Sequence, residues 1–140
     1  MAGAQILLPA AWPRPKGYAN GVLAEGRTVF VAGQIGWDET ERLVADDFAG
    51  QFRQVLINTL AVLGEAGACA EHVCRMTWFV TSRDEYLAAL PAIGRHWREL
   101  MGHNFPAMSV VAVAALVEAG AKVEIETTAV IPLAGEDPTR

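Results

Sequence analysis

The sequence has little of what defines several common classes of protein. Only two of its 140 residues are cysteines, so we expect no disulfide framework. Basic residues number 11 against 16 acidic ones, and the net charge of −5 argues against a nucleic-acid partner, because such binding depends on clustered Lys and Arg. No apolar run is long and charge-free enough to span a bilayer, so we expect no membrane partner either.

The beginning of the chain does not look like a targeting segment. The residues MAGAQILLPAAWPRP lack a basic stretch and are interrupted by Pro9, unlike a signal peptide, so we expect a cytoplasmic protein. The composition, 52% hydrophobic and 19% charged, is that of a chain that buries a core. We divide it into a proline-rich lead-in over 1–16, a single domain over 17–132 and a flexible tail over 133–140.

One short cluster contains side chains that metals favour. Cys69 and Cys74 flank His72, but three ligands are one short of a closed zinc shell, and a fourth would have to come from His96 or His103, far along the chain. Cys74 is better explained as a small buried strand residue and Cys69 as a loop residue. We expect no metal and no other cofactor.

The first half of the chain predicts two strands followed by a helix. Strands are expected over 21–24 and 28–35, because the second of these is rich in β-branched and aromatic residues and a turn separates the two. A polar loop follows. Apolar residues then recur at three- and four-residue spacing, which predicts a helix that is capped by Asp46 or Asp47 and ends at Gly67.

A strand and a second helix follow. The strand is expected over 73–81, and Ser82 with a glutamate three residues later is typical of a helix start. The helix should continue to Met101. Pro91 lies inside it and removes one backbone hydrogen bond, so we expect a kink or a break near Leu87.

The segment 105–132 is strongly apolar and shapes the fold prediction. We interpret it as two paired strands, over 107–117 and 122–131, with a tight connection around Gly120. The first strand is apolar on both faces, whereas the second alternates. Two amphipathic helices can cover one face of the mixed sheet, which predicts a two-layer α+β sandwich. The other face needs cover, and further copies of the same chain are the simplest source.

Five segments carry a resemblance to a known family: GYANGV, VFVAGQI, VCRMTWFVTS, NFPAMSVV and KVEIETTAV. In this order and at these separations, over about residues 17–130, they resemble the RidA family, also called YjgF or endoribonuclease L-PSP. The resemblance implies a chorismate-mutase-like fold and a homotrimer with ligand pockets between subunits. Its active members hydrolyse reactive enamines and imines to a keto acid and ammonia, so it also implies an enamine or imine deaminase with a small-molecule ligand.

Only part of the family's site is preserved. Tyr18 matches a pocket tyrosine, Gly33 matches backbone that lines the pocket, and Glu124 matches the glutamate that orients the attacking water. Three polar positions of the active deaminases are apolar here: Met108, where they have the arginine that binds the substrate carboxylate, Val110 and Leu90.

The departure at Met108 has a large expected cost. Leaving a carboxylate buried without its partner costs about 3–5 kcal/mol, so a small imino acid bound in the same pose would lose about two to four powers of ten in affinity. Arg14, Arg75 and His103 are alternative cations, although each also fits a solvated or salt-bridged side chain. Glu124 and Glu126 share one strand face, either as an enclosed pair of raised pKa or as rim carboxylates.

Two functions therefore stay open. The first is a Rid-like hydrolase for an enamine or imine that is larger or lacks a small carboxylate, bound in an apolar pocket. The second is a non-catalytic trimer that binds a small metabolite or a partner protein. The loss of three polar pocket positions, with the fold-bearing segments retained, motivates the second.

Overall fold

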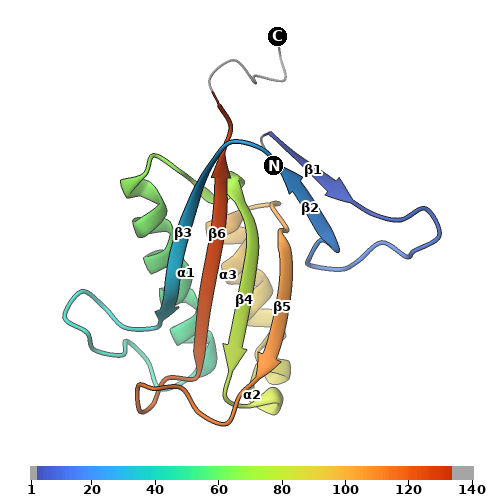
Figure 1. Ribbon diagram of the computed structural model, residues 1–140. Coiled ribbons are helices and arrows are strands. Elements are labelled where there is room, and N and C mark those ends of the chain that lie inside the picture. The colour runs from blue at the N-terminus through green and yellow to red at the C-terminus, as the bar shows by residue number, and fades with distance from the viewer. Residues whose placement is uncertain (1–2, 134–140) are drawn as a thin grey trace.

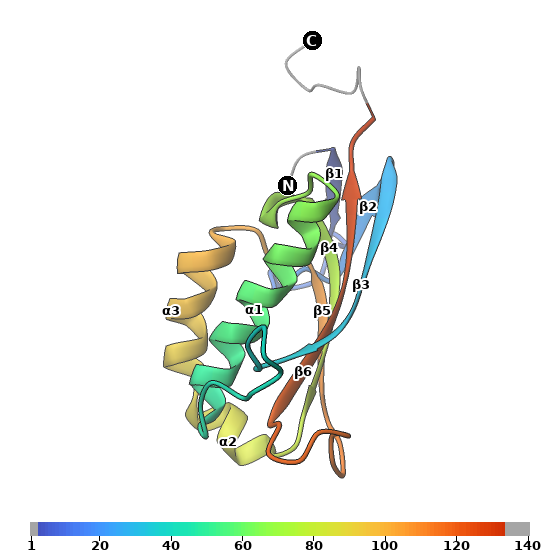
Figure 2. The ribbon, with the colours of Figure 1, turned by 90° about the vertical axis from the view of Figure 1, so that its left-hand side faces the viewer.

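The computed structural model describes residues 3–133 and forms a four-stranded sheet, a hairpin and a helical layer. Its elements follow in this order: β1 (Ala4–Leu7), β2 (Gly21–Ala24), β3 (Arg27–Ile35), α1 (Phe48–Glu65), η1 (Ala70–His72), β4 (Val73–Val80), α2 (Arg83–Ala88), α3 (Leu90–Met101), β5 (Ala107–Ala112) and β6 (Val123–Ile131). The strand order of the main sheet is β3-β6-β4-β5, in which only β4 and β5 run parallel. Figures 1 and 2 show the helices on one face of this sheet, so the predicted two-layer α+β arrangement with a mixed sheet is confirmed.

The helix α1 forms where the apolar stripe predicted it. Its cap is Asp47, whose carboxylate accepts a hydrogen bond from the Gly50 N–H at 3.3 Å. The apolar stripe is buried against the sheet and contains Phe48, Phe52, Val55, Leu56 and Leu63. Each large side chain that is fully removed from water contributes about 1.5–3 kcal/mol, so this face fixes the helix to the sheet.

The second helical region is broken, as Pro91 predicted. α2 and α3 are separate, and Pro91 lies in the first turn of α3, where its missing N–H leaves no helical hydrogen bond unmade. The hydroxyl of Ser82 caps α2 by accepting from the Glu85 N–H at 3.1 Å. The Glu85 carboxylate pairs with Lys122 Nζ at 2.6 Å, which connects α2 to the start of β6.

The expected pairing of the last two strands is wrong. β5 and β6 are not neighbours, because β4 lies between them and pairs with both. The helices α2 and α3 form the long crossover that a parallel β4–β5 pair requires. β5 ends at Ala112 rather than at 117, and residues 113–122 pass the end of β4, as Figure 1 shows. The alternation predicted for β6 is confirmed, since Val123, Ile125 and Ala129 are buried.

The proline-rich lead-in contains a strand that the sequence analysis did not predict. β1 pairs with β2 in an antiparallel hairpin, and the prolines lie in the connecting residues 8–20. The residues before β2 contact the start of β5, and Figure 1 shows the hairpin beside this end of the strand. There the Ala19 N–H donates to the Pro106 carbonyl at 3.0 Å, and Ala19 forms a parallel bridge with Ala107. This contact holds the residues before β2 beside the edge of the sheet.

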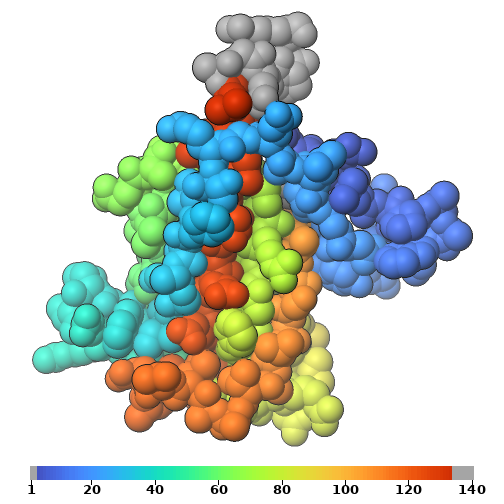
Figure 3. Space-filling model, in the orientation of Figure 1, coloured from blue at the N-terminus to red at the C-terminus, as the bar shows by residue number. Residues whose placement is uncertain are grey.

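The second face of the main sheet is open in the single chain. Figure 3 views this face, and no helix lies in front of its strands. Phe30 of β3 is 80% exposed there, and Val111 of β5 is also exposed. Among residues 3–133, no helix is long and apolar enough to cross a membrane. Apart from Leu133, the tail expected over 133–140 lies outside the described residues.

Candidate functional site

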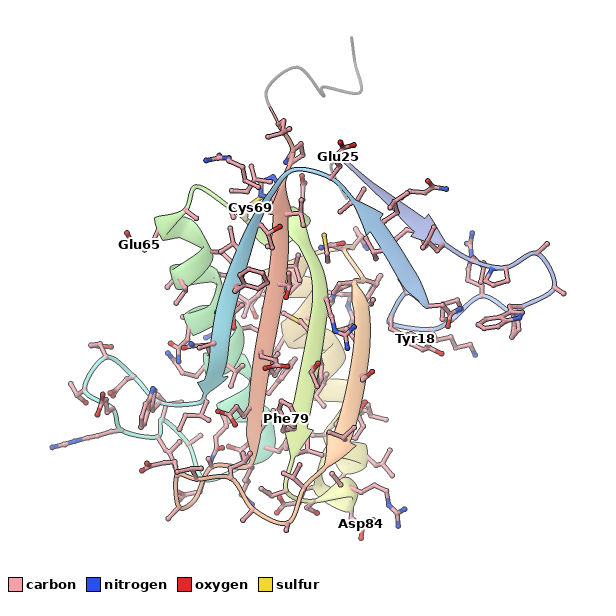
Figure 4. All side chains as sticks on the ribbon, viewed as in Figure 1. Tyr18, Glu25, Glu65, Cys69, Phe79 and Asp84 are labelled. Atoms are coloured by element: carbon pink, nitrogen blue, oxygen red, sulfur yellow. The ribbon has the colours of Figure 1, made fainter. Side chains whose placement is uncertain are left out.

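A cavity of about 370 Å³ opens on the helix side of the molecule, where α3, β5 and the residues before β2 meet. Small-molecule sites have volumes of about 300–1,000 Å³, so a ligand fits this space. Four residues selected from the sequence line it: Tyr18, Leu90, Met108 and Val110. Met108 and Val110 alternate with outward residues along β5, and Figure 4 shows Tyr18 beside the beginning of this strand.

The wall of the cavity is largely aromatic. Trp97 stacks on Phe105 with ring centroids 6.1 Å apart, and Trp78 lies 6.1 Å from Trp97 and 6.4 Å from the ring of Tyr86, which it meets edge to face. Burial raises the pKa of the Tyr86 phenol above its ordinary value. The sequence alone does not identify these rings as site residues, because aromatic residues at helical or strand spacing are equally typical of a core.

Basic side chains complete the lining. Lys16, Arg98 and His103 contribute to the cavity, and no residue of its described lining carries a carboxylate. The Arg98 side chain lies over Gly94, since its Nη1 is 3.3 Å from the position that a Cβ on Gly94 would take. The cavity therefore combines an apolar wall with positive charge.

The other two selected residues lie together on the open face. Gly33 lies where the register between β3 and β6 shifts, so it occupies an irregularity of the strand. A Cβ on Gly33 would be only 2.6 Å from Oε1 of Glu124. Glu124 stands between the buried Val123 and Ile125 and so points away from the helices. The absence of a side chain at Gly33 allows the carboxylate to lie against the β3 backbone.

One chain does not bring all six selected residues together. The cavity residues face the helices, whereas Gly33 and Glu124 lie on the open face, where Phe79 is opposite Glu124 in the register of β4 and β6. Figure 4 labels Phe79 on β4, beside the end of β5, and Tyr18 beside the beginning of β5. The single chain therefore divides the six candidate residues between two regions on opposite faces of its sheet.

The remaining charged candidates are divided between these regions. Glu126 lies two residues after Glu124 on β6 and lines a shallow hollow of the open face together with Arg75. Arg75 makes no ion pair within 4.0 Å among the described residues. His103 lines the aromatic cavity, whereas Arg14 and Arg75 do not. Of the cations that the sequence analysis considered, His103 is thus the one that reaches the cavity.

A tight turn is stabilised by hydrogen bonds among Cys69, His72 and Cys74. His72 Nδ1 accepts a hydrogen bond from the Cys69 N–H at 3.0 Å, and the Cys74 thiol donates to the His72 carbonyl at 3.4 Å. Cys69 is exposed and Cys74 is buried, as predicted from their positions. Within residues 3–133, no three His, Cys, Asp or Glu side chains are grouped so that they could hold a metal.

Known proteins resemble the chain over nearly its whole length. The profile of the family described as endoribonuclease L-PSP matches residues 11–131. A 2-iminobutanoate/2-iminopropanoate deaminase from Dermatophagoides farinae is 31% identical over 132 residues, which are 94% of this chain and 99% of the relative. The Rid-family protein YyfB from Yersinia pestis superposes with a TM-score of 0.80 at 31% identity, covering 92% of this chain and 99% of that one. E. coli TdcF, solved with bound serine, gives 0.67 at 29% identity, covering 91% and 98%.

Proposed function

Because the chain belongs to the endoribonuclease L-PSP family, which includes the YjgF and Rid proteins, we propose that it hydrolyses a reactive enamine or imine and releases ammonia. In this reaction the oxygen of water adds to the carbon of the C=N bond, the C–N bond breaks, and a carbonyl product and ammonia leave. The relative named a 2-iminobutanoate/2-iminopropanoate deaminase supports this reaction class. We place the reaction in the cytoplasm.

Glu124 is the proposed group that orients and deprotonates the attacking water. General-base catalysis contributes about 10²–10⁴-fold to a rate, so this residue should dominate the chemical step. The backbone at Gly33 holds a polar atom of the substrate, and Tyr18 positions its other end. The observation that carries the proposal is the position of the Glu124 carboxylate beside Gly33, where a side chain would collide with it, since a Cβ would be 2.6 Å from Oε1.

A homotrimer is the proposed assembly, with each site between two subunits. Two features support it: the open sheet face exposes Phe30, and each chain divides the candidate residues between opposite faces of its sheet. A neighbouring subunit that brings its Gly33 and Glu124 to the cavity would complete one site. Sedimentation equilibrium should give a mass about three times the 15.0 kDa of the chain, and a monomer mass would contradict this assembly.

Ammonia release from a panel of freshly generated imino and enamino acids tests the function. The wild type should exceed the uncatalysed rate, and Glu124→Gln should lower kcat by about 10²–10⁴-fold. Glu126→Gln is the matched control, because Glu126 lies on the same strand and the same face. Absence of turnover, or equal activity of Glu124→Gln and Glu126→Gln, would show that the proposal is wrong.

A second function is favoured by the apolar residues in the cavity. Met108, Val110 and Leu90 line it in place of the polar groups of active deaminases, which suits a trimer that binds a small metabolite or a partner protein without turnover. Thermal shift separates the two functions, since ligands that stabilise the protein without ammonia release support binding alone.

A further inference from the structure

We infer that Arg98 binds the carboxylate of the ligand, and that the helix-side cavity selects a carboxylate with a large apolar or aromatic body. The inference rests on the function proposed above and extends it, because it gives the class of imino acid that the enzyme would hydrolyse. Three observations carry it: the position of Arg98, the absence of an ion pair for it within residues 3–133, and the aromatic character of the cavity wall.

The position of Arg98 follows from its place on α3. Leu90, Gly94 and Arg98 are spaced four residues apart, so they lie along one stripe of the helix, and all three line the cavity. Helical side chains lean toward the N-terminus, which carries the guanidinium over Gly94, 3.3 Å from where its Cβ would be. Glycine in a helix is less stable than alanine, and here its missing side chain opens the space that the guanidinium occupies.

Arg98 is also available to an anion. No carboxylate of the described residues lies within 4.0 Å of it. Glu99, its neighbour in sequence, is engaged by Arg53 at 2.9 Å, and this hydrogen bond holds the pKa of Glu99 below its usual value. A guanidinium presents paired N–H donors that match the two oxygens of a carboxylate. Arg98 can therefore supply, from α3, the recognition that Met108 on β5 lacks.

The aromatic wall of the cavity selects the group that carries the carboxylate of the ligand. Trp78, Tyr86, Trp97 and Phe105 form one continuous set of packed rings on the cavity wall. A volume of about 370 Å³ lies within the range of sites for drug-sized ligands, so a small imino acid would leave part of the wall in contact with water. A phenyl or branched aliphatic group would displace that water and gain the free energy of apolar burial. Arg98, for the carboxylate, and the aromatic wall, for the apolar group, thus line the same cavity.

Titration calorimetry with three probes tests the inference on the intact protein: 3-phenylpropanoate, propanoate and 3-phenylpropanamide. Wild type should bind 3-phenylpropanoate at least about tenfold more tightly than either of the others, because each lacks one recognised part. Arg98→Met should weaken 3-phenylpropanoate about 10- to 100-fold and leave the amide nearly unchanged. Arg98→Lys should lose less, since it keeps the charge without the paired donors.

Arg95→Met is the matched control, because Arg95 is exposed on the same helix and does not line the cavity. Equal binding of the acid and the amide by wild type would overturn the inference, as would equal affinities of Arg98→Met and Arg95→Met for the acid. Binding of propanoate as tight as that of 3-phenylpropanoate would overturn the apolar selectivity.

Turnover separates this inference from the proposed function. Imines are generated from phenylalanine and alanine by an amino-acid oxidase, and ammonia release is followed. Arg98→Met should raise KM for the phenylalanine-derived imine with little change in kcat, because the carboxylate is bound equally in substrate and transition state. Binding through Arg98 without turnover of either imine would refute hydrolysis and keep the carboxylate site. Turnover with an unchanged KM in Arg98→Met would keep hydrolysis and refute the carboxylate site.

Discussion

The two regions that contain the candidate residues differ in how well they agree with the resemblance to the family. On the open face, the missing side chain of Gly33 leaves room for the carboxylate of Glu124, and the family resemblance predicts both residues in the site. On the helix side, Met108, Val110 and Leu90 line an aromatic cavity, whereas the family resemblance predicts polar groups at these three positions. Groups that act on water would thus be retained while groups that recognise the substrate have changed. This difference favours a changed substrate over a lost reaction. Substitutions can alter the Gly33–Glu124 region and the helix-side cavity separately.

The largest effect is expected from Gly33→Ala on the open face. Gly33 does not have a positive φ, so alanine fits its backbone, but the new Cβ would be 2.6 Å from Oε1 and 2.9 Å from Cδ of Glu124. The carboxylate must move, while the rest of the fold need not. Since Glu124 is the proposed base, ammonia release should fall about a hundredfold or more with little change in melting temperature.

The control for this glycine is Gly64→Ala in α1. A Cβ there meets nothing within 4 Å, and replacing a helical glycine by alanine should stabilise the fold by about 0.5–1 kcal/mol. If Gly33→Ala keeps full activity, the carboxylate does not depend on its contact with β3. The proposed role of Gly33 in positioning the Glu124 carboxylate would then be wrong.

Next in size is Met108→Arg, which tests the changed half. It restores a cation on β5 inside the cavity, so kcat/KM for the alanine-derived imine should rise by at least about tenfold. The phenylalanine-derived imine should gain nothing, because the longer side chain fills space that the ring would use. In an Arg98→Met background the gain should be larger, since two guanidinium groups in one cavity repel each other. Steady-state kinetics of the four proteins provides the measurement.

Met108→Val is the control for this substitution, since it changes the volume of the side chain and adds no charge. A rise in activity in the valine variant would attribute the effect to shape. No gain in Met108→Arg, with the fold intact, would mean that the cavity has diverged in more than one position.

Most of the fold could be predicted from local patterns. The apolar stripe and a cap at Asp46 or Asp47 predicted α1, which the structure caps with Asp47, and Pro91 predicted the break before α3. The partner of β5 could not be predicted, because a short connection before β6 is equally typical of a hairpin and of a loop that passes one strand. Neighbouring strands lie only about 4.8 Å apart, so residues 113–122 easily span the β4 strand between them.

The candidate site was predictable to a lesser degree. The resemblance supplied Tyr18, Gly33 and Glu124, but it contains no information on residues that are particular to this chain. Arg98 and Gly94 are unremarkable in sequence, as a charged residue and a glycine on a helix usually are. Their relation appears only when the helix places both on the cavity face, four residues apart. Such residues depend on tertiary packing, which local sequence patterns do not report.

The smallest expected effect concerns Tyr86, on the cavity wall, and depends on pH. Burial raises the pKa of its phenol above the value of 10.0 for a free tyrosine, so as pH rises the unfolded chain loses this proton first. The free energy of unfolding should therefore fall above about pH 10, and Tyr86→Phe should remove part of that slope. The chain has two tyrosines, so tyrosinate absorbance in Tyr18→Phe reports Tyr86 alone.

Saturation with 3-phenylpropanoate should raise the midpoint of the Tyr86 titration further, because the ligand displaces water from the cavity wall and adds a negative charge nearby. An unchanged midpoint would place the bound carboxylate away from the aromatic cavity, and the contrast between the two halves of the site would then rest on Gly33 and Glu124 alone.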